Sequence, residues 1–135
     1  MRRTKEQLRA SHAWSAISGL DRLTPENKKK IAVAIKGLPV RIQASGLGQA
    51  MTFLRAKKDF RELEGIIVHW LLNDFPMTYQ RPQERDDPSA QLIERIIQGD
   101  ATMLRRWTEE SLAYLPWLSR FAEGAGMMQV AGNRD

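Results

Sequence analysis

Hydrophobic residues recur every three or four positions along almost the whole chain, which is the spacing of an amphipathic α-helix. Alternating apolar and polar residues, as in a half-buried β-strand, form no convincing run. The pattern predicts helices over about 4–20, 24–45, 47–58, 60–74, 88–98 and 100–123. We therefore predict an all-α fold, a compact single-domain bundle of about six helices.

Local signals predict where several of these helices begin and end. Thr4 and Gln7 have the spacing of a capping box, in which each side chain bonds a backbone N–H that the helix leaves free. Thr24 followed by Pro25 suits a second start, because Thr caps well and Pro at the first helical position gives up no hydrogen bond. Gly46 predicts the end of that second helix.

Proline and glycine predict the irregular parts of the chain. Pro39 lacks the donor that would bond the carbonyl of Ile35, so we expect a kink or a break in the second helix. Pro116 is expected to bend the last helix for the same reason. Residues 75–88 hold three prolines and mixed charges, which predicts a loop. Residues 124–135 are Gly-rich and polar, which predicts a flexible tail.

The composition narrows the class of protein. The chain has 135 residues, the size of one ordinary domain, so 1–135 is expected to form a single helical domain. It contains no cysteine, which excludes disulfides, thiolate metal sites and a cysteine nucleophile. The apolar runs are far shorter than the roughly 20 residues of a membrane span, and polar residues follow the basic start. We expect a cytoplasmic protein with no membrane contact.

The net charge of +5 is distributed unevenly. Residues 1–61 hold fourteen Lys and Arg against four acidic residues, a net charge of +10, whereas residues 62–135 carry a net charge of −5. A basic half suits contact with phosphates, and an acidic half suits a basic surface on another protein or a neighbouring copy. Charge alone leaves open the alternative of a solvated surface with no partner.

None of the residue patterns that carry catalysis is recognisable. His12 and His69 lack metal-ligand spacing, and a lone helical histidine is more often structural. Glu109 and Glu110 are adjacent and therefore point to different sides of a helix, which is unsuited to a carboxylate pair. The segment 46–48 resembles part of a dinucleotide loop but follows no strand. We predict no enzymatic activity, no metal and no cofactor.

Two features of the basic half point to nucleic acid. Lys28, Lys29 and Lys30 open the second helix, where the helix dipole disfavours cations, so their charge is expected to serve another purpose. Gly46 and Gly48 would let the backbone approach a ligand closely, although a tight turn between helices needs them equally.

The spacing of residues 44–54 also loosely matches a helix-turn-helix motif. In that interpretation the third helix would read DNA through Gln49, Thr52 and Arg55, and the protein would be a dimeric DNA-binding regulator. A third class is a helical adaptor that contacts no nucleic acid. It would be favoured if the basic residues were spread evenly over the surface.

Two stretches resemble one protein family. LPVRIQASGLGQAMTFLRAK (Leu38–Lys57) resembles the segment in which a proline-bearing helix meets a Gly-Leu-Gly-Gln turn and an apolar helix. TEESLAYLPWLSRFAEG (Thr108–Gly124) resembles the closing helix of the same family. The family is the small helical subunit of the type III-B CRISPR effector complex, the fifth subunit of its RAMP (Cmr) module. The chain departs from it at Ala44-Ser45, where a more polar turn is usual, and at Pro116.

The resemblance implies a non-catalytic subunit for antiviral defence. Members stack beside the backbone subunits and support the duplex of guide RNA and target RNA, which a neighbouring subunit cuts. The implied partners are the other subunits, neighbouring copies, guide RNA and target RNA. We expect the isolated subunit to be mostly monomeric, because the sequence has no long heptad seam. The side chains expected to face RNA, through its backbone and not its bases, are Lys36, Arg41, Arg55, Lys57 and Lys58, with Arg105 and Arg106 as second-tier candidates.

Overall fold

The computed structural model describes residues 2–74 and 87–129, and these residues form six α-helices and no strand. This confirms the predicted all-α fold. The helices, with a short 3₁₀ turn (η1) and a π turn (η2), are α1 (Lys5–Ser18), α2 (Pro25–Ser45), α3 (Leu47–Arg55), η1 (Lys58–Phe60), α4 (Arg61–His69), η2 (Trp70–Asp74), α5 (Pro88–Gln98) and α6 (Ala101–Gly124).

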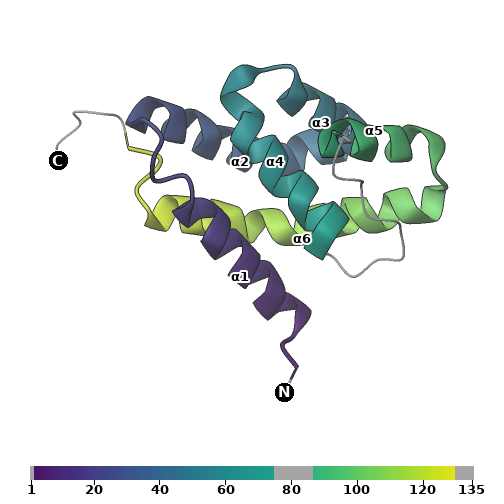
Figure 1. Ribbon diagram of the computed structural model, residues 1–135, viewed down its shortest axis with the longest axis horizontal. Helices are drawn as coiled ribbons and strands as arrows, with labels where there is room; N and C mark the ends of the chain where they lie inside the picture. Colours follow the sequence, from purple (N-terminus) through teal and green to yellow (C-terminus); the bar gives the residue numbers. More distant parts are fainter. Residues whose placement is uncertain (1, 75–86, 130–135) are drawn as a thin grey trace.

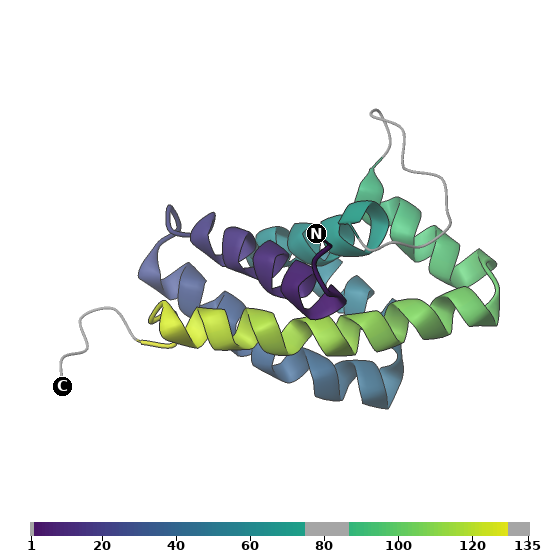
Figure 2. The same ribbon diagram turned by 90° about the horizontal axis from the view of Figure 1, so that it is seen from below.

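Helix α6 extends along the long axis of the molecule and contacts both α1 and α2 (Figures 1 and 2). The remaining helices α3, α4 and α5 pack on one another toward the end of the molecule where α6 begins. Helix α6 holds this central place because one of its faces is buried and mainly apolar from Trp107 to Ala122. The residues buried on it are Trp107, Glu110, Ser111, Tyr114, Leu115, Leu118 and Ala122.

The predicted caps are confirmed. The Thr4 hydroxyl accepts from the backbone N–H of Gln7 at 3.1 Å, and the Gln7 side chain accepts from the N–H of Thr4 at 2.8 Å. Thr24 accepts from the N–H of Asn27 at 3.2 Å at the start of α2. Each of these bonds satisfies a donor that a helix start leaves without a partner.

Proline does not interrupt the long helices. Helix α2 continues through Pro39 and α6 continues through Pro116, so the break considered for α2 does not occur. The buried face of α2 explains this result, because Ile35, Leu38 and Ile42 on both sides of the proline pack into one core. The free energy of that burial offsets the lost hydrogen bond.

A single glycine joins α2 to α3. Gly46 has a backbone φ of +90°, which residues other than glycine rarely adopt. This one residue is both the C-cap of α2 and the N-cap of α3. Its N–H donates to the carbonyl of Ile42 at 2.8 Å, and its carbonyl accepts from Ala50. Helix α3 therefore turns away from α2 immediately, as the glycine predicted.

The third and fourth predicted helices are shorter than expected. Helix α3 ends at Arg55, and η1 fills the interval before α4. Helix α4 ends at His69, and the following turn, 70–74, has π-helical hydrogen bonding. Trp70 and Leu71 in this π turn are buried.

The chain after α6 folds back in the described part of the predicted tail, 125–129. Gly126 has φ of +75°, and the N–H of Met127 donates to the carbonyl of Ala122 at 3.0 Å. This is a Schellman ending, and it directs the Met127 side chain into the core. Residues 125–129 of the predicted tail therefore form a defined turn against the core, and the flexibility of the tail stays a prediction. Residues 130–135, like most of the predicted loop at 75–88, lie outside the described residues.

A buried carboxylate links three elements. The side chain of Glu110 on α6 is 3% exposed and forms a bidentate ion pair with Arg9 of α1, at 2.7 and 2.8 Å. Its Oε2 also accepts from the indole N–H of Trp70 at 3.0 Å. The hydrogen bonds with Glu110 raise the pKa of Arg9 above its ordinary value. The pair fixes where α1 and the π turn lie on α6.

Replacing Glu110 by Ala is expected to reduce the free energy of unfolding by about 3 kcal/mol. The loss is large because Arg9 and the Trp70 N–H would both lose their acceptor, yet Arg9 would keep its bond to Glu6 at 3.0 Å. Urea unfolding at pH 7 measures the effect. The matched control is Glu109→Ala, an exposed neighbour, with an expected change below about 0.5 kcal/mol. Equal losses in the two variants would contradict the assignment.

Candidate nucleic-acid interface

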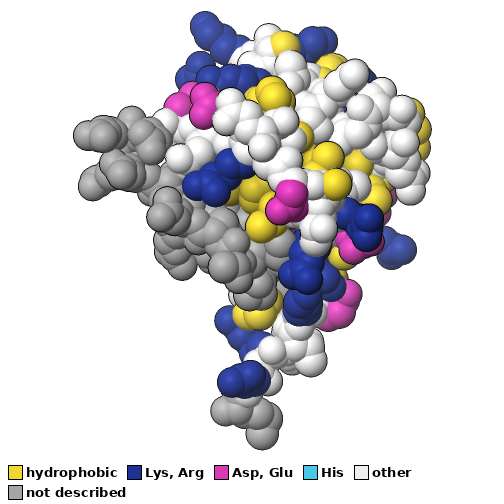
Figure 3. Space-filling view, turned by 90° about the vertical axis from the view of Figure 1, so that its right-hand side faces the viewer, with side chains coloured by type: hydrophobic (Ala, Val, Ile, Leu, Met, Phe, Trp, Pro, Cys, Tyr) yellow, Lys and Arg dark blue, Asp and Glu magenta, His cyan; other side chains and the backbone are white. Residues whose placement is uncertain are grey.

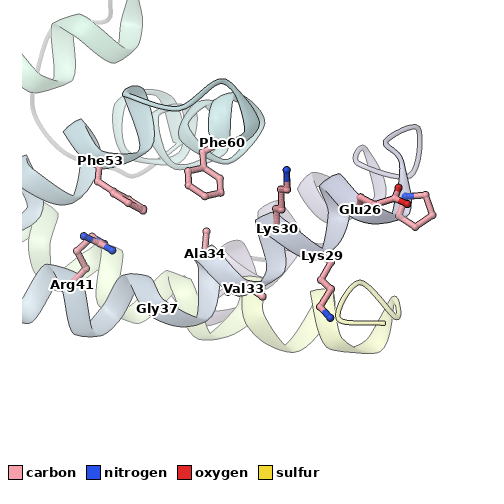
Figure 4. Close-up of a pocket in the computed structure, with 10 residues that line it drawn as sticks. Glu26, Lys29, Lys30, Val33, Ala34, Gly37, Arg41, Phe53 and Phe60 are labelled. Atoms are coloured by element: carbon pink, nitrogen blue, oxygen red, sulfur yellow. The ribbon is translucent and has the colours of Figure 1, made fainter. Parts of the chain in front are cut away.

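A groove of about 560 Å³ runs between α2 and the segment that joins α3 to α4. Figure 4 shows Phe53 of α3 and Phe60 of η1 pointing toward α2, with Ala34, Gly37 and Arg41 on the opposite side. The described residues that line it are Pro25, Glu26, Lys29, Lys30, Val33, Ala34, Gly37, Arg41, Phe53 and Phe60. Its walls are mainly apolar and its edges are mainly cationic.

Aromatic rings and cations are layered in this groove. The guanidinium carbon of Arg41 lies 3.6 Å from the centre of the Phe53 ring, and the Phe53 and Phe60 centroids are 5.6 Å apart. The ammonium of Lys57 lies 5.7 Å from the first ring centre and 6.0 Å from the second. A cation over an aromatic face is held by the ring's quadrupole. Arg41 and Lys57, both predicted to contact RNA, are thus brought together here.

The local fold explains why these rings reach the groove. Phe53 lies beside the buried face of α3, which consists of Leu47, Ala50, Met51 and Leu54. Phe60 ends η1 and directly precedes α4. Both rings are half-buried, so each packs against the core on one side and lines the groove on the other.

Two other predicted RNA contacts are ion-paired within the chain. The ammonium of Lys36 lies 2.8 Å from Glu123 of α6, and its hydrogen bond holds the pKa of that carboxyl below its ordinary value. Arg55 lies 2.7 Å from Asp87 and 3.6 Å from the buried Glu64. The charge of both cations is therefore partly neutralised before any ligand binds.

Lys58, Arg105 and Arg106 are exposed. Lys58 begins η1 close to the groove, whereas the two arginines lie in the first half of α6. None of the three forms an ion pair within the described ranges 2–74 and 87–129. On the face shown in Figure 3, Lys and Arg occur in separate groups among apolar and acidic side chains.

Sequence reasoning missed a polar cluster where α1, α4 and α6 meet. His12 bonds the Tyr114 hydroxyl through Nδ1, and its Nε2 lies 3.1 Å from Nδ1 of His69. The two imidazoles stack with centroids 5.3 Å apart. No group of three or more His, Cys, Asp or Glu able to hold a metal occurs among the described residues. The two histidines therefore contact each other and connect α1 with α4, which lie far apart in the sequence.

The helix-turn-helix interpretation finds little support in the geometry of α3. The Thr52 hydroxyl donates to the carbonyl of Gly48 at 2.9 Å, and Arg55 holds two carboxylates. Helix α3 also packs against α5 and buries Leu47, Ala50, Met51 and Leu54. Two of the three proposed reading side chains are thus engaged within the protein.

The family described as CRISPR-associated protein (Cas_Cmr5) matches residues 5–125, which is most of the chain. The chain belongs to the CRISPR-associated Cmr5 family. The Cmr5 family is a small-subunit family of the CRISPR Cmr complex and is not known as catalytic.

A crystal structure of a CRISPR-associated Cmr5 family protein from Thermus thermophilus has the same fold. The TM-score is 0.70, with 24% sequence identity, and the match covers 90% of this chain and 97% of that chain. Both comparisons agree with the resemblance found in the sequence. No helix in the described part of this chain has the length and apolar character needed to cross a membrane.

The ion pair between Arg55 and Asp87 makes stability depend on pH. The Arg55 hydrogen bond holds the pKa of Asp87 below its ordinary value in the folded state. Asp87 therefore contributes stability above its unfolded pKa of about 3.9, and this contribution is lost as the pH falls through the folded pKa. Both side chains are substantially exposed, which limits the contribution to about 1 kcal/mol or less.

We expect Asp87→Asn to be less stable than the natural chain at pH 7 and equally stable in strong acid. Asn keeps the N-cap of α5 but carries no charge, so the variant removes the ion pair together with the attraction of the carboxylate to the start of α5. Urea unfolding at several pH values between about 2 and 7 measures the difference. In an Arg55→Ala background the same substitution should have a smaller effect, and an unchanged effect would contradict the pairing.

Proposed function

We propose that this chain is the non-catalytic small subunit of a type III-B complex and supports the duplex of guide RNA and target RNA. It would do so by contacts with the RNA backbone that do not depend on base sequence. The observation that carries the proposal is the grouping of Arg41 and Lys57 at the groove, with Lys58 nearby. Among the described residues these three cations have no acidic partner, so their charge is available to phosphates.

The nature of these side chains favours backbone contact. Arg41, Lys57 and Lys58 are exposed, and an exposed cation gains energy from any phosphate within reach. An RNA-guided complex reads its target by base pairing, so a supporting subunit must bind all guides alike. Lys36 and Arg55 would contribute less because each already holds a carboxylate. Arg105 and Arg106 remain second-tier candidates.

The other subunits and neighbouring copies are proposed to dock elsewhere on the chain. Trp14 on α1 is 62% exposed and packs edge-on against Phe121 of α6. Trp117 lies near the same helix pair and donates to Glu6 at 2.9 Å. Exposed aromatic residues are enriched at protein interfaces, which supports a protein partner here. We expect the isolated subunit to be mostly monomeric and the complex to act in the cytoplasm.

Arg41→Ala and Lys57→Ala are each expected to weaken binding of target RNA by the assembled complex roughly two- to fivefold. The loss should be the same for every guide sequence, because phosphates carry no sequence information. Each substitution should also reduce the slope of log affinity against log salt by about 1. Titrations with several guides at two or more salt concentrations measure both effects.

Lys36→Ala is the matched control for these variants. It removes the same charge, but from an ammonium that already pairs with Glu123, so a smaller loss is expected. A loss limited to particular guides would argue against the proposed backbone contacts. An equal loss from Lys36→Ala would argue against the greater contribution of Arg41 and Lys57.

A further inference from the structure

We propose that the groove between α2 and Phe60 binds unpaired bases of single-stranded RNA by stacking. The inference rests on the proposed function in taking RNA as the ligand, but it assigns a second kind of contact to the same site. A duplex presents phosphates and sugars, whereas its base faces are already stacked inside it. Cations alone are enough to contact the phosphates of a duplex. The apolar and aromatic walls of this groove therefore indicate a ligand that also has apolar flat surfaces.

The walls offer a platform for flat rings. The guanidinium carbon of Arg41 lies 3.6 Å from the centre of the Phe53 ring, and Arg41 is exposed. The half-buried Phe60 ring lies beside this layer, tilted 38° from Phe53. Bases stack on aromatic rings and on Arg guanidinium planes, and this stacking tolerates any sequence.

Cations flank the platform where a sugar–phosphate backbone would pass. Lys57 lies near both rings, and Lys29 lines the groove further along α2. Neither holds an ion pair within the described part of the chain, whereas Lys30 is paired with Asp59 at 3.1 Å. The part of α2 between Lys29 and Arg41 is about 18 Å long. This length exceeds that of one nucleotide, so the groove has room for more than one.

Gly37 keeps the α2 side of the groove open. It lies in the interior of α2, where glycine destabilises a helix relative to alanine. Packing does not require it, because a Cβ built there would meet no atom within 4 Å. The missing side chain leaves space opposite the two rings (Figure 4). A larger residue at this position would occupy that space without disturbing the core.

An acidic amphipathic helix of a partner protein is the competing occupant, since it would also supply apolar and anionic groups. The observations favour RNA because every nucleotide joins a flat ring to a phosphate. The stacked Arg41 and Phe53 side chains would contact the flat ring, and the nearby ammonium of Lys57 would contact the phosphate. The experiment below separates the two occupants.

The test uses the full-length subunit and two labelled RNA probes at low salt, a single-stranded ten-residue oligouridylate and a ten-base-pair duplex. Gly37→Leu fills the groove with a good helix former, and Phe60→Leu removes the ring but keeps an apolar side chain. Each is expected to weaken binding of the single strand at least about fivefold and to change duplex binding less than about twofold. Gly37→Ala, the matched control, adds only one methyl group and should bind the single strand within about twofold of the natural chain.

Three outcomes would overturn the inference. The first is unchanged single-strand affinity in both Gly37→Leu and Phe60→Leu, and the second is an equal loss for single strand and duplex. The third is impaired assembly of the Cmr complex with single-strand affinity intact, which would assign the groove to a protein. Failure of the proposed function looks different, because Arg41→Ala and Lys57→Ala would then leave RNA binding by the assembled complex unchanged. If Gly37→Leu does not fold, Phe60→Leu alone decides the question.

Discussion

Burial of the Glu110 carboxylate is the constraint on which the arrangement of the helices depends. A charged group that is 3% exposed must be paired and hydrogen-bonded, and here Arg9 and the Trp70 indole supply those bonds. Arg9 comes from α1 and Trp70 from the π turn after α4, so one carboxylate determines how both lie on α6. Apolar packing between the same elements is less directional and would tolerate small slips of one helix along another.

The helices could be predicted from the sequence because their causes are local. The capping box of Thr4 and Gln7, the start at Thr24 and the turn at Gly46 involve residues at most three positions apart or a single residue. The signal at Gly126 was also local, since a glycine followed by an apolar residue suits a Schellman ending. It was overlooked because the surrounding composition is typical of a tail.

The environment of individual charged residues could not be predicted in the same way. Glu109 and Glu110 are adjacent and chemically identical, yet only Glu110 meets Arg9, which lies 101 positions away in the sequence. The partners of Lys36 and Arg55 likewise come from α6 and from the cap of α5. Hydrophobic periodicity indicates which face of a helix is buried, but it does not indicate which charges meet across helices. For the groove a signal did exist in the sequence, because Phe53 and Phe60 are aromatic residues that do not belong to the buried faces of α3 and α4.

Helix α2 has two faces, one that packs in the core and stabilises the fold and one that lines the groove. Ile31, Ile35, Leu38 and Ile42 repeat at three- and four-residue intervals and are buried, whereas Lys29, Val33, Gly37 and Arg41 repeat at four-residue intervals along the groove. Because the two sets occupy different faces of one helix, changes along the groove leave the core unaltered. A groove side chain can therefore vary under selection for its ligand alone. The same separation explains how Gly37 is tolerated, because the buried isoleucines hold the helix that the glycine weakens.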